Sequence, residues 1–197
     1  MPTASNPTNP FENQTDIGSV RYPGVCVYDP KQQIFTLTSA GANIWGDHDD
    51  FLFVWKRMRG DFIATVRAGF IGAGANPHRK LGWMARSSLD TSSPEVSTGI
   101  HGDGLVILQF RREQGGLTEE VRTALKGADV IQLERKGSTY ILSAAHYGEP
   151  FTIVQASDLD LGAEVYLGLY LCSHEEEIVE KATYRDVRIV APVKAGF

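Results

Sequence analysis

Cysteine is scarce in this chain: its 197 residues include only Cys26 and Cys172. Two cysteines are too few for a disulfide framework, and each lies in an apolar run, where a free thiol behaves as a small hydrophobic side chain. We therefore expect both to be unbridged. A chain of this length can bury a sizeable core without disulfides or a structural metal.

Basic charge is also in short supply. Lys and Arg number 19 against 24 Asp and Glu, so the formal net charge is −5. Nucleic-acid binding requires clustered Lys and Arg to neutralise phosphates, and we expect no nucleic-acid partner. The basic residues that do cluster, Lys56, Arg57 and Arg59, lie among acidic neighbours and indicate a solvated face of mixed charge.

Long apolar runs are missing as well. No stretch approaches the length of a membrane helix, so we expect no membrane contact. The first residues lack the basic and apolar regions of a secretory signal, which makes the cytoplasm the default location unless a leader was trimmed. Residues 1–10 are predicted to be a disordered or extended polar tail, and residues 11–197 a single domain.

What the chain does have is apolar residues alternating with period two, between turns rich in Gly, Asp, Asn and Pro. This pattern is typical of strands in a β-sandwich. We expect strands over residues 25–28, 33–38, 51–58, 62–70, 81–87, 96–101, 105–112, 130–135, 139–145, 165–173 and 183–190. The fold class is predicted to be all-β, a two-sheet antiparallel sandwich.

One segment, residues 116–129, carries conflicting signals. Thr118 could cap a helix, and Val121 and Leu125 have helical spacing. Its position between predicted strands favours a strand and loop equally well. Both interpretations stay open.

Four segments in order resemble a known family. They are ANIWGDHDDFLFVWKRMRGDF (42–62), RKLGWMARSSLDTSSP (79–94), GLVILQFRREQGG (104–116) and GLYLCSHEEEIVEKATYRDVRI (168–189). They are similar to motifs of bacterial concanavalin A-like lectin/glucanase-type sandwich domains, which occur as accessory modules of secreted glycosidases and TolB-like propeller proteins. The resemblance implies a concanavalin A-like jelly roll and a carbohydrate context, but no activity. Asn43 stands where the motif has Asp, which weakens any role of that carboxylate.

A concanavalin-like sandwich usually binds ligands on its concave sheet. Alternation along three predicted strands places a polar and aromatic set on one face: Arg86, Gln109, Arg111, Tyr170 and His174, with His101 at a strand end. Sugars need such a mixture of aromatic rings and planar hydrogen-bonding groups. The alternative is a solvent-exposed face with Arg86 in a structural ion pair. If Arg86 pairs with Glu95 or another acid of the groove, it organises the site; if its guanidinium is free, it can bind sugar hydroxyls or a uronate carboxylate. Trp45 and Trp55 are either sugar platforms or core residues.

The evidence for catalysis is weaker. Glycosidases need two carboxylates flanking the scissile bond, and no predicted strand carries alternating acids. Glu175, Glu176 and Glu177 indicate a solvated surface, and the glycines around His101 and Asp103 favour a hairpin turn over an acid–base pair. Three functions remain: a carbohydrate-binding module, which we favour, a sugar hydrolase or lyase using His101 and His174, and a protein-interaction domain.

A structural calcium ion is the one metal considered, and no cofactor is required. Calcium prefers carboxylate and other oxygen ligands. Asp186 in the closing strand, with Asp16 or Glu12 near the start, forms the candidate set, because first and last strands often adjoin in such sandwiches. The acidic turn of Asp47, Asp49 and Asp50 is a lesser candidate.

Overall fold

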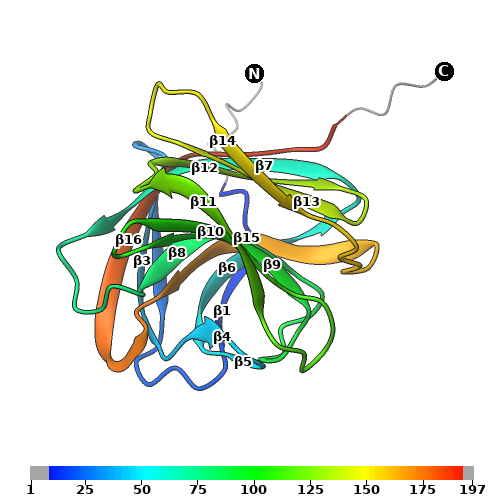
Figure 1. Cartoon of the computed structure of the whole chain (residues 1–197). Helices are drawn as coiled ribbons and strands as arrows, with labels where there is room; N and C mark the ends of the chain where they lie inside the picture. Colours follow the sequence, from blue (N-terminus) through cyan, green and yellow to red (C-terminus); the bar gives the residue numbers. More distant parts are fainter. Residues whose placement is uncertain (1–8, 193–197) are drawn as a thin grey trace, which may run out of the picture.

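The fold consists of two large antiparallel sheets packed face to face (Figure 1). The computed structural model describes residues 9–192. The first sheet has the strand order β1-β6-β15-β8-β9-β10-β11 and the second β14-β13-β12-β7-β16-β3-β2. The strands of the first sheet are β1 (Asn13–Ile17), β6 (Phe51–Arg59), β15 (Glu164–Cys172), β8 (Lys80–Arg86), β9 (Glu95–His101), β10 (Leu105–Arg111) and β11 (Glu119–Lys126).

The second sheet is built from the remaining long strands. These are β14 (Thr152–Ala156), β13 (Thr139–Ala145), β12 (Val130–Lys136), β7 (Phe62–Ile71), β16 (Glu175–Val190), β3 (Ile34–Gly41) and β2 (Val25–Asp29). A separate two-stranded hairpin pairs β4 (Ile44–Trp45) with β5 (His48–Asp49). The predicted all-β antiparallel sandwich is confirmed.

Every strand predicted from the alternating pattern is present. The boundaries are shifted by a residue or two except in β3, which ends three residues later at Gly41, and in β16, which begins at Glu175. The segment left open, residues 116–129, contains the strand β11. Its side chains alternate between half-buried Val121, Thr123 and Leu125 and exposed neighbours. This period of two places it at the edge of the first sheet, paired with β10. The strands β1 and β14 and the β4–β5 hairpin were not predicted.

The core fills the space between the two sheets. It is formed by the inward side chains of each strand, among them Trp83, Leu108 and Leu169 from the first sheet and Val66 and Leu133 from the second. Burial of this apolar surface supplies the main stabilising free energy of such a fold. Within residues 9–192, no helix is long and apolar enough to cross a membrane.

Both cysteines are free, as predicted. Cys172 is fully buried, and burial raises the pKa of its thiol to about 11. Of the predicted tail, residues 1–8 lie outside the described part of the chain. Phe11 is already packed in the core, edge-on to Phe35 at a centroid distance of 5.3 Å.

The first and last strands do not adjoin, contrary to expectation. The first strand, β1, lies at the edge of the first sheet beside β6. The last strand, β16, lies inside the second sheet between β7 and β3. The two strands belong to different sheets, so the residues of β1 and β16 lie in different layers of the sandwich.

Candidate functional site

The outer face of the first sheet, turned away from the core, carries most of the residues singled out from the sequence. Arg86 on β8, Gln109 and Arg111 on β10 and Tyr170 on β15 all belong to the alternating set opposite the core residues. The structure therefore brings these four side chains to one face. None of them is exposed: all four are at most 2% accessible to solvent.

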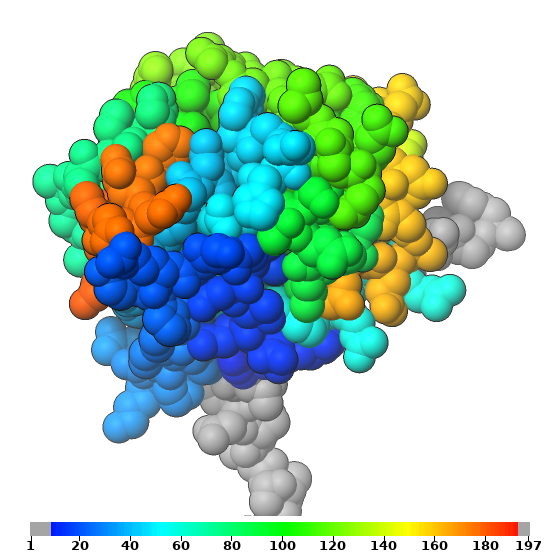
Figure 2. All heavy atoms as spheres, turned by 90° about the horizontal axis from the view of Figure 1, so that it is seen from below, coloured from blue at the N-terminus to red at the C-terminus, as the bar shows by residue number. Residues whose placement is uncertain are grey.

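The β4–β5 hairpin lies across this face and contributes to their burial (Figures 1 and 2). Ile44 of the hairpin is fully buried in a second apolar cluster on the outer face, together with Phe51, Phe53, Met84 and Tyr170. In Figure 2 the hairpin region, in cyan, fills the middle of the face viewed from below. The chain itself thus occupies the expected ligand groove.

Tyr170 is part of this second cluster and not an exposed sugar platform. It is 1% accessible, its ring packs edge-on against Phe51 at 5.9 Å, and its hydroxyl donates to the carbonyl oxygen of Thr98 over 3.0 Å. The hydroxyl of Tyr184 in turn donates to the carbonyl oxygen of Tyr170. Alternation predicted the face of Tyr170 correctly, but it carries no information about a hairpin covering that face.

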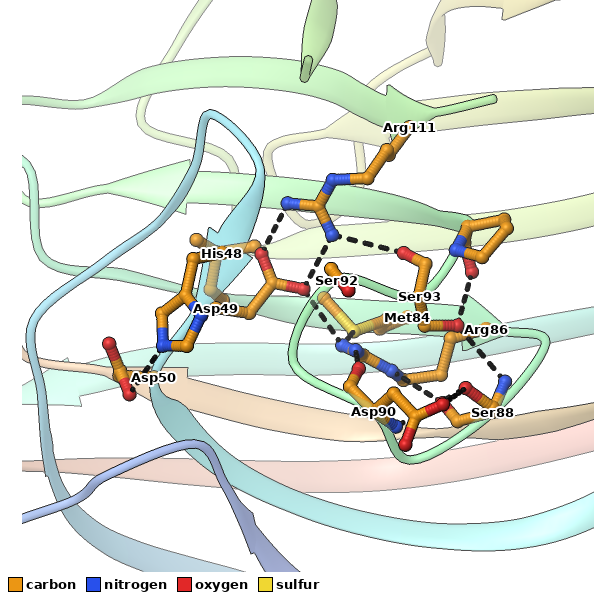
Figure 3. A network of polar contacts seen from close by, with 12 residues as sticks. His48, Asp49, Asp50, Met84, Arg86, Ser88, Asp90, Ser92, Ser93 and Arg111 are labelled. Carbon is orange, nitrogen blue, oxygen red and sulfur yellow. Dashed lines mark hydrogen bonds and ion pairs between the residues drawn. The ribbon is translucent and has the colours of Figure 1, made fainter. Parts of the chain in front are cut away.

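Asp49 of the hairpin holds the two buried arginines (Figure 3). Nη1 and Nη2 of Arg111 donate to Oδ2 and Oδ1 of Asp49 over 2.9 and 2.7 Å, and Nη1 of Arg86 donates to Oδ2 over 3.2 Å. All three side chains have no solvent exposure. Arg86 also donates to the carbonyl oxygens of Ser88 and Asp90. Of the two sequence-based alternatives for Arg86, the structure shows the ion pair, with Asp49 as its acid.

Further hydrogen bonds fix the hairpin through its backbone carbonyl groups. Nε2 of Gln109 and Nζ of Lys80 donate to the oxygen of Ile44 over 2.7 and 3.1 Å. The backbone nitrogen and hydroxyl of Thr118 donate to the oxygen of Gly46 over 2.9 and 2.8 Å. These bonds satisfy carbonyls that would otherwise be buried unpaired, so the hairpin is an integral part of the sheet surface.

Glu95, the partner suggested for Arg86, behaves differently. Its side chain is fully buried beside the Asp49 network, and neither carboxyl oxygen has a hydrogen-bond partner. Burial, reinforced by the nearby negative charge of Asp49, raises the pKa of Glu95 to about 8. A carboxyl group in this environment holds its proton at neutral pH.

One end of the outer face remains open. A hollow of about 260 Å³, which we call the histidine pocket, lies between the hairpin, the start of β8 and the turns that follow β9 and β15. It is lined by Asn43, Trp45, His78, Lys80, His101, Leu105, Glu120, Arg122 and His174. The two histidines predicted from the sequence, His101 and His174, therefore meet here, joined by His78, which was not predicted.

The three histidine rings are neighbours. The ring centroid of His78 lies 6.1 Å from that of His101 and 5.4 Å from that of His174. His101 is 7% accessible, and neither of its ring nitrogens has a hydrogen-bond partner. Burial and the nearby charge of Lys80 lower the pKa of His101 to about 3. At neutral pH the ring is uncharged, with one nitrogen able to donate and the other able to accept.

The loops that carry His78 and His174 are anchored by buried polar contacts. Nη1 of Arg79 pairs with Oε2 of Glu180 over 2.6 Å, and both side chains are almost fully buried. Nδ2 of Asn76 donates to Oε1 of Glu175 over 2.7 Å. His174 itself adopts a left-handed backbone conformation with φ of 63°, in the tight turn between β15 and β16. These contacts therefore hold the two loops that form this wall of the pocket in place.

The tryptophans separate into two roles. Trp45 at the tip of β4 is 45% exposed and lines the histidine pocket. Trp55 on β6 is half-buried, packs edge-on against Tyr166 at 4.9 Å and donates from Nε1 to the hydroxyl of Thr15 over 3.0 Å. Only Trp45 presents an aromatic surface to this pocket.

The calcium candidates are not brought together. Asp16 on β1 accepts the backbone N–H of Gly24 over 2.9 Å, whereas Asp186 on β16 forms an exposed ion pair with Arg67 at 3.4 Å. Glu12 contacts Arg57 at 3.8 Å. Within residues 9–192, no three His, Cys, Asp or Glu side chains are arranged to hold a metal ion.

The acidic turn does not form a cluster of free carboxylates. Asp49 binds the two arginines, and Asp50 accepts the backbone N–H of Ser19 over 2.6 Å. Asp47 is exposed at the tip of the hairpin. The carboxylates of this turn therefore serve different contacts.

Sequence reasoning missed Lys80 and His78 as pocket residues. Lys80 is the first residue of β8, whose residues are all buried. A lysine is seldom fully buried without a partner, so its place next to the apolar run that follows is a signal the sequence does contain. A larger hollow of about 290 Å³ lies elsewhere, between Pro10, Tyr28 and Val187. None of its described lining residues has a buried unpaired polar atom.

Comparison with known proteins gives no close relative. No family model matches the sequence, and no curated protein matches it. The resemblance to the bacterial accessory-module family therefore stays a prediction.

Solved structures do match. The chain is similar to a functionally unknown protein from Saccharomyces cerevisiae, with a TM-score of 0.65 and 16% identity over 87% of this chain and 97% of that one. It is also similar to the carbohydrate binding module CBM66 from Bacillus subtilis, with a TM-score of 0.56 and 13% identity over 92% of this chain and 98% of that one. A third similar structure is lectin UEA-II complexed with galactose, with a TM-score of 0.53 and 8% identity over 90% of this chain and 97% of that one. The chain has the fold that these structures share, the concanavalin A-like jelly roll.

Proposed function

We propose that this protein is a carbohydrate-binding module and that the histidine pocket is its sugar site. The observation that carries the proposal is the combination of a half-exposed Trp45 with the buried, unpaired nitrogens of His101 in one hollow. Sugar recognition uses an aromatic surface against the apolar face of the ring and hydrogen-bonding groups for the hydroxyls. Two structures with the same fold, CBM66 and lectin UEA-II, are by their descriptions a carbohydrate binding module and a galactose complex.

The size of the pocket suits a small ligand. Its volume of about 260 Å³ falls just below the range of roughly 300–1,000 Å³ that is typical for drug-sized ligands. One sugar ring at the end or branch of a glycan fits such a hollow better than an extended stretch of chain. The buried residues Arg86, Gln109, Arg111 and Tyr170 act on the site indirectly, because they hold the hairpin that carries Trp45.

Binding is favoured over hydrolysis by the carboxylates of the pocket. A paired-carboxylate mechanism needs two acids across the scissile bond. Among the described residues that line the pocket, Glu120 supplies the one carboxylate, and it is paired with Arg122. A module that binds without cleaving needs no second acid.

The test is a glycan array followed by calorimetric titration of each hit against two variants. Trp45→Ala should weaken binding by roughly 1–3 kcal/mol, the scale of one stacked aromatic side chain, while the fold is retained. Phe151→Ala is the matched control, because Phe151 has nearly the same exposure, 46%, just before β14 of the other sheet. Equal affinities of wild type and Trp45→Ala would remove this pocket as the sugar site.

A further inference from the structure

Lys80 lies at the floor of the histidine pocket without an acidic partner. It is 3% accessible, and its Nζ donates to Oδ1 of Asn43 and to the carbonyl oxygen of Ile44, each over 3.1 Å. An ammonium group has three N–H donors, so one is left over beside the pocket. No Asp or Glu side chain among residues 9–192 forms an ion pair with Lys80.

The carboxylates nearest the pocket are engaged elsewhere. Glu120 pairs with Arg122 on the same strand. Asp103, in the turn after β9, accepts the backbone N–H of Leu105 over 3.0 Å, and Glu175 accepts from Asn76. None of these carboxylates therefore forms an ion pair with Lys80, although the charge of Glu120 in the same pocket acts on it from a greater distance.

His101 supplies a second unsatisfied group next to Lys80. The two residues are directly paired across β8 and β9, and His101 is nine-tenths buried with both ring nitrogens unpartnered. Leaving a buried charge and a buried polar ring unpaired is unfavourable. A bound ligand that brings a negative charge and a hydroxyl group would satisfy both.

We propose that the histidine pocket recognises an acidic sugar, whose carboxylate is bound by Nζ of Lys80 while neutral His101 hydrogen-bonds a neighbouring hydroxyl. This inference rests on the proposed carbohydrate-binding function and specifies its ligand class. The half-exposed ring of Trp45 lies against the apolar face of the same sugar. Burial lowers the pKa of Lys80 in the unliganded protein, and a bound carboxylate would favour the charged form of the lysine.

Asn43 provides an isosteric test of this assignment. Its Oδ1 accepts both from Nζ of Lys80 and from its own neighbour, the backbone N–H of Ile44, over 2.8 Å. The substitution Asn43→Asp keeps the acceptor oxygen but gives Lys80 an internal counter-ion. Asn13→Asp is the matched control, since Oδ1 of Asn13 likewise accepts the N–H of the next residue, Gln14, over 2.8 Å. Asn13 lies on β1, at the opposite edge of the sheet from β11.

The experiment is calorimetric titration with tetrasaccharides of galacturonate, glucuronate, mannuronate and guluronate, each beside the same tetrasaccharide with its carboxyl groups reduced to alcohols. Inorganic phosphate is titrated in parallel. At least one acidic tetrasaccharide should bind tenfold or more tightly than its reduced form. Asn43→Asp should weaken binding of the acidic form at least tenfold more than binding of the reduced form, whereas Asn13→Asp should behave as wild type.

The possible outcomes distinguish a failure of the acidic-sugar assignment from a failure of the proposed carbohydrate binding. Equal affinity for acidic and reduced tetrasaccharides would overturn the role of Lys80 and leave a neutral-sugar module. Binding of phosphate alone would overturn the acidic-sugar assignment, and the glycan array would then decide whether the pocket binds other sugars. Binding of none of the probes would reject the acidic-sugar assignment, and the glycan array would then decide on other sugars. The comparison of acidic and reduced forms needs only the wild-type protein, so it holds even if Asn43→Asp fails to fold.

Discussion

Asp49 and Arg111 form a bidentate ion pair in which two parallel hydrogen bonds of 2.9 and 2.7 Å join side chains that are both fully buried. Because Arg86 shares the same carboxylate, Asp49 holds two guanidinium groups at once. The pair connects β5 of the hairpin to β10, the strand next to the edge strand β11 of the first sheet.

We expect Asp49→Asn to be strongly destabilising, because two buried guanidinium groups would lose their only carboxylate partner among the described residues. Removing one partner of a buried pair costs roughly 3–5 kcal/mol. Urea unfolding measures the loss as a lower midpoint. Asp47→Asn, two residues away on the exposed tip, is the control and should unfold as wild type does; a similar loss in both variants would contradict the interpretation.

Glu95 predicts a specific dependence of stability on pH. The folded protein keeps the proton of Glu95 up to about pH 8, whereas the unfolded chain releases it near the ordinary glutamate pKa of 4.5. Between these values the folded state binds more protons, so this group lowers the free energy of unfolding by about 1.4 kcal/mol per pH unit as pH rises. Its stabilising contribution is complete below about pH 4.5 and lost above about pH 8.

The variant Glu95→Gln should remove that slope, because an amide does not titrate. The measurement is the free energy of unfolding of both proteins from pH 5 to pH 8. The difference between them should grow in favour of the variant as pH rises. The same change at the exposed Glu113 should keep the wild-type slope, and parallel curves for wild type and Glu95→Gln would show that Glu95 does not titrate in this range.

Tyr170 should respond to substitution as a core residue. Tyr170→Phe removes the hydroxyl that donates to Thr98 and should cost roughly 1–3 kcal/mol, the penalty of an unsatisfied buried group. Tyr170→Ala also opens a cavity and should cost roughly 3–5 kcal/mol. Thermal or urea unfolding distinguishes the two. A Tyr170→Ala protein with wild-type stability would be inconsistent with the burial of this ring.

Gly82 allows β8 and β9 to approach closely. A Cβ at this position would lie 1.8 Å from the carbonyl oxygen of Thr98, which is backbone and cannot rotate away. Gly82→Ala should therefore destabilise the fold near the upper end of the roughly 1–3 kcal/mol typical of overpacking. Gly69→Ala on β7, where a Cβ would meet nothing within 4 Å, is the control. Equal unfolding midpoints would show that the sheet adapts without cost.

The period-two pattern predicted the sandwich and the sheet faces well because alternation reports directly on which side chains meet the core. Phe35, Leu37, Val66 and Leu133 all lie in the core as their alternation indicates. The pattern could not predict β4 and β5, since strands of two residues have no period to detect.

The candidate site was less predictable, since it depends on contacts between distant segments. Asp49 lies 37 residues from Arg86 and 62 residues from Arg111 along the chain. No local sequence spacing predicts contacts over such separations. The face shared by Arg86, Gln109, Arg111 and Tyr170 was predicted correctly, but its cover was not. His101 and His174 reached the open pocket because both lie at strand ends, beyond the edge of the hairpin.

The hairpin on the outer face competes, as part of the same chain, with any ligand for the surface that it covers. A segment joined covalently to its own docking surface acts at an effective concentration that can reach the millimolar range for a short connection, and here it gains the Asp49 ion pairs in addition. If the chain binds glycans as proposed, a glycan would be confined to the end of the face that the hairpin leaves uncovered. The length of residues 42–50 would then set how much of the sheet a bound polysaccharide contacts, and a shorter segment should leave more of this face open to the ligand.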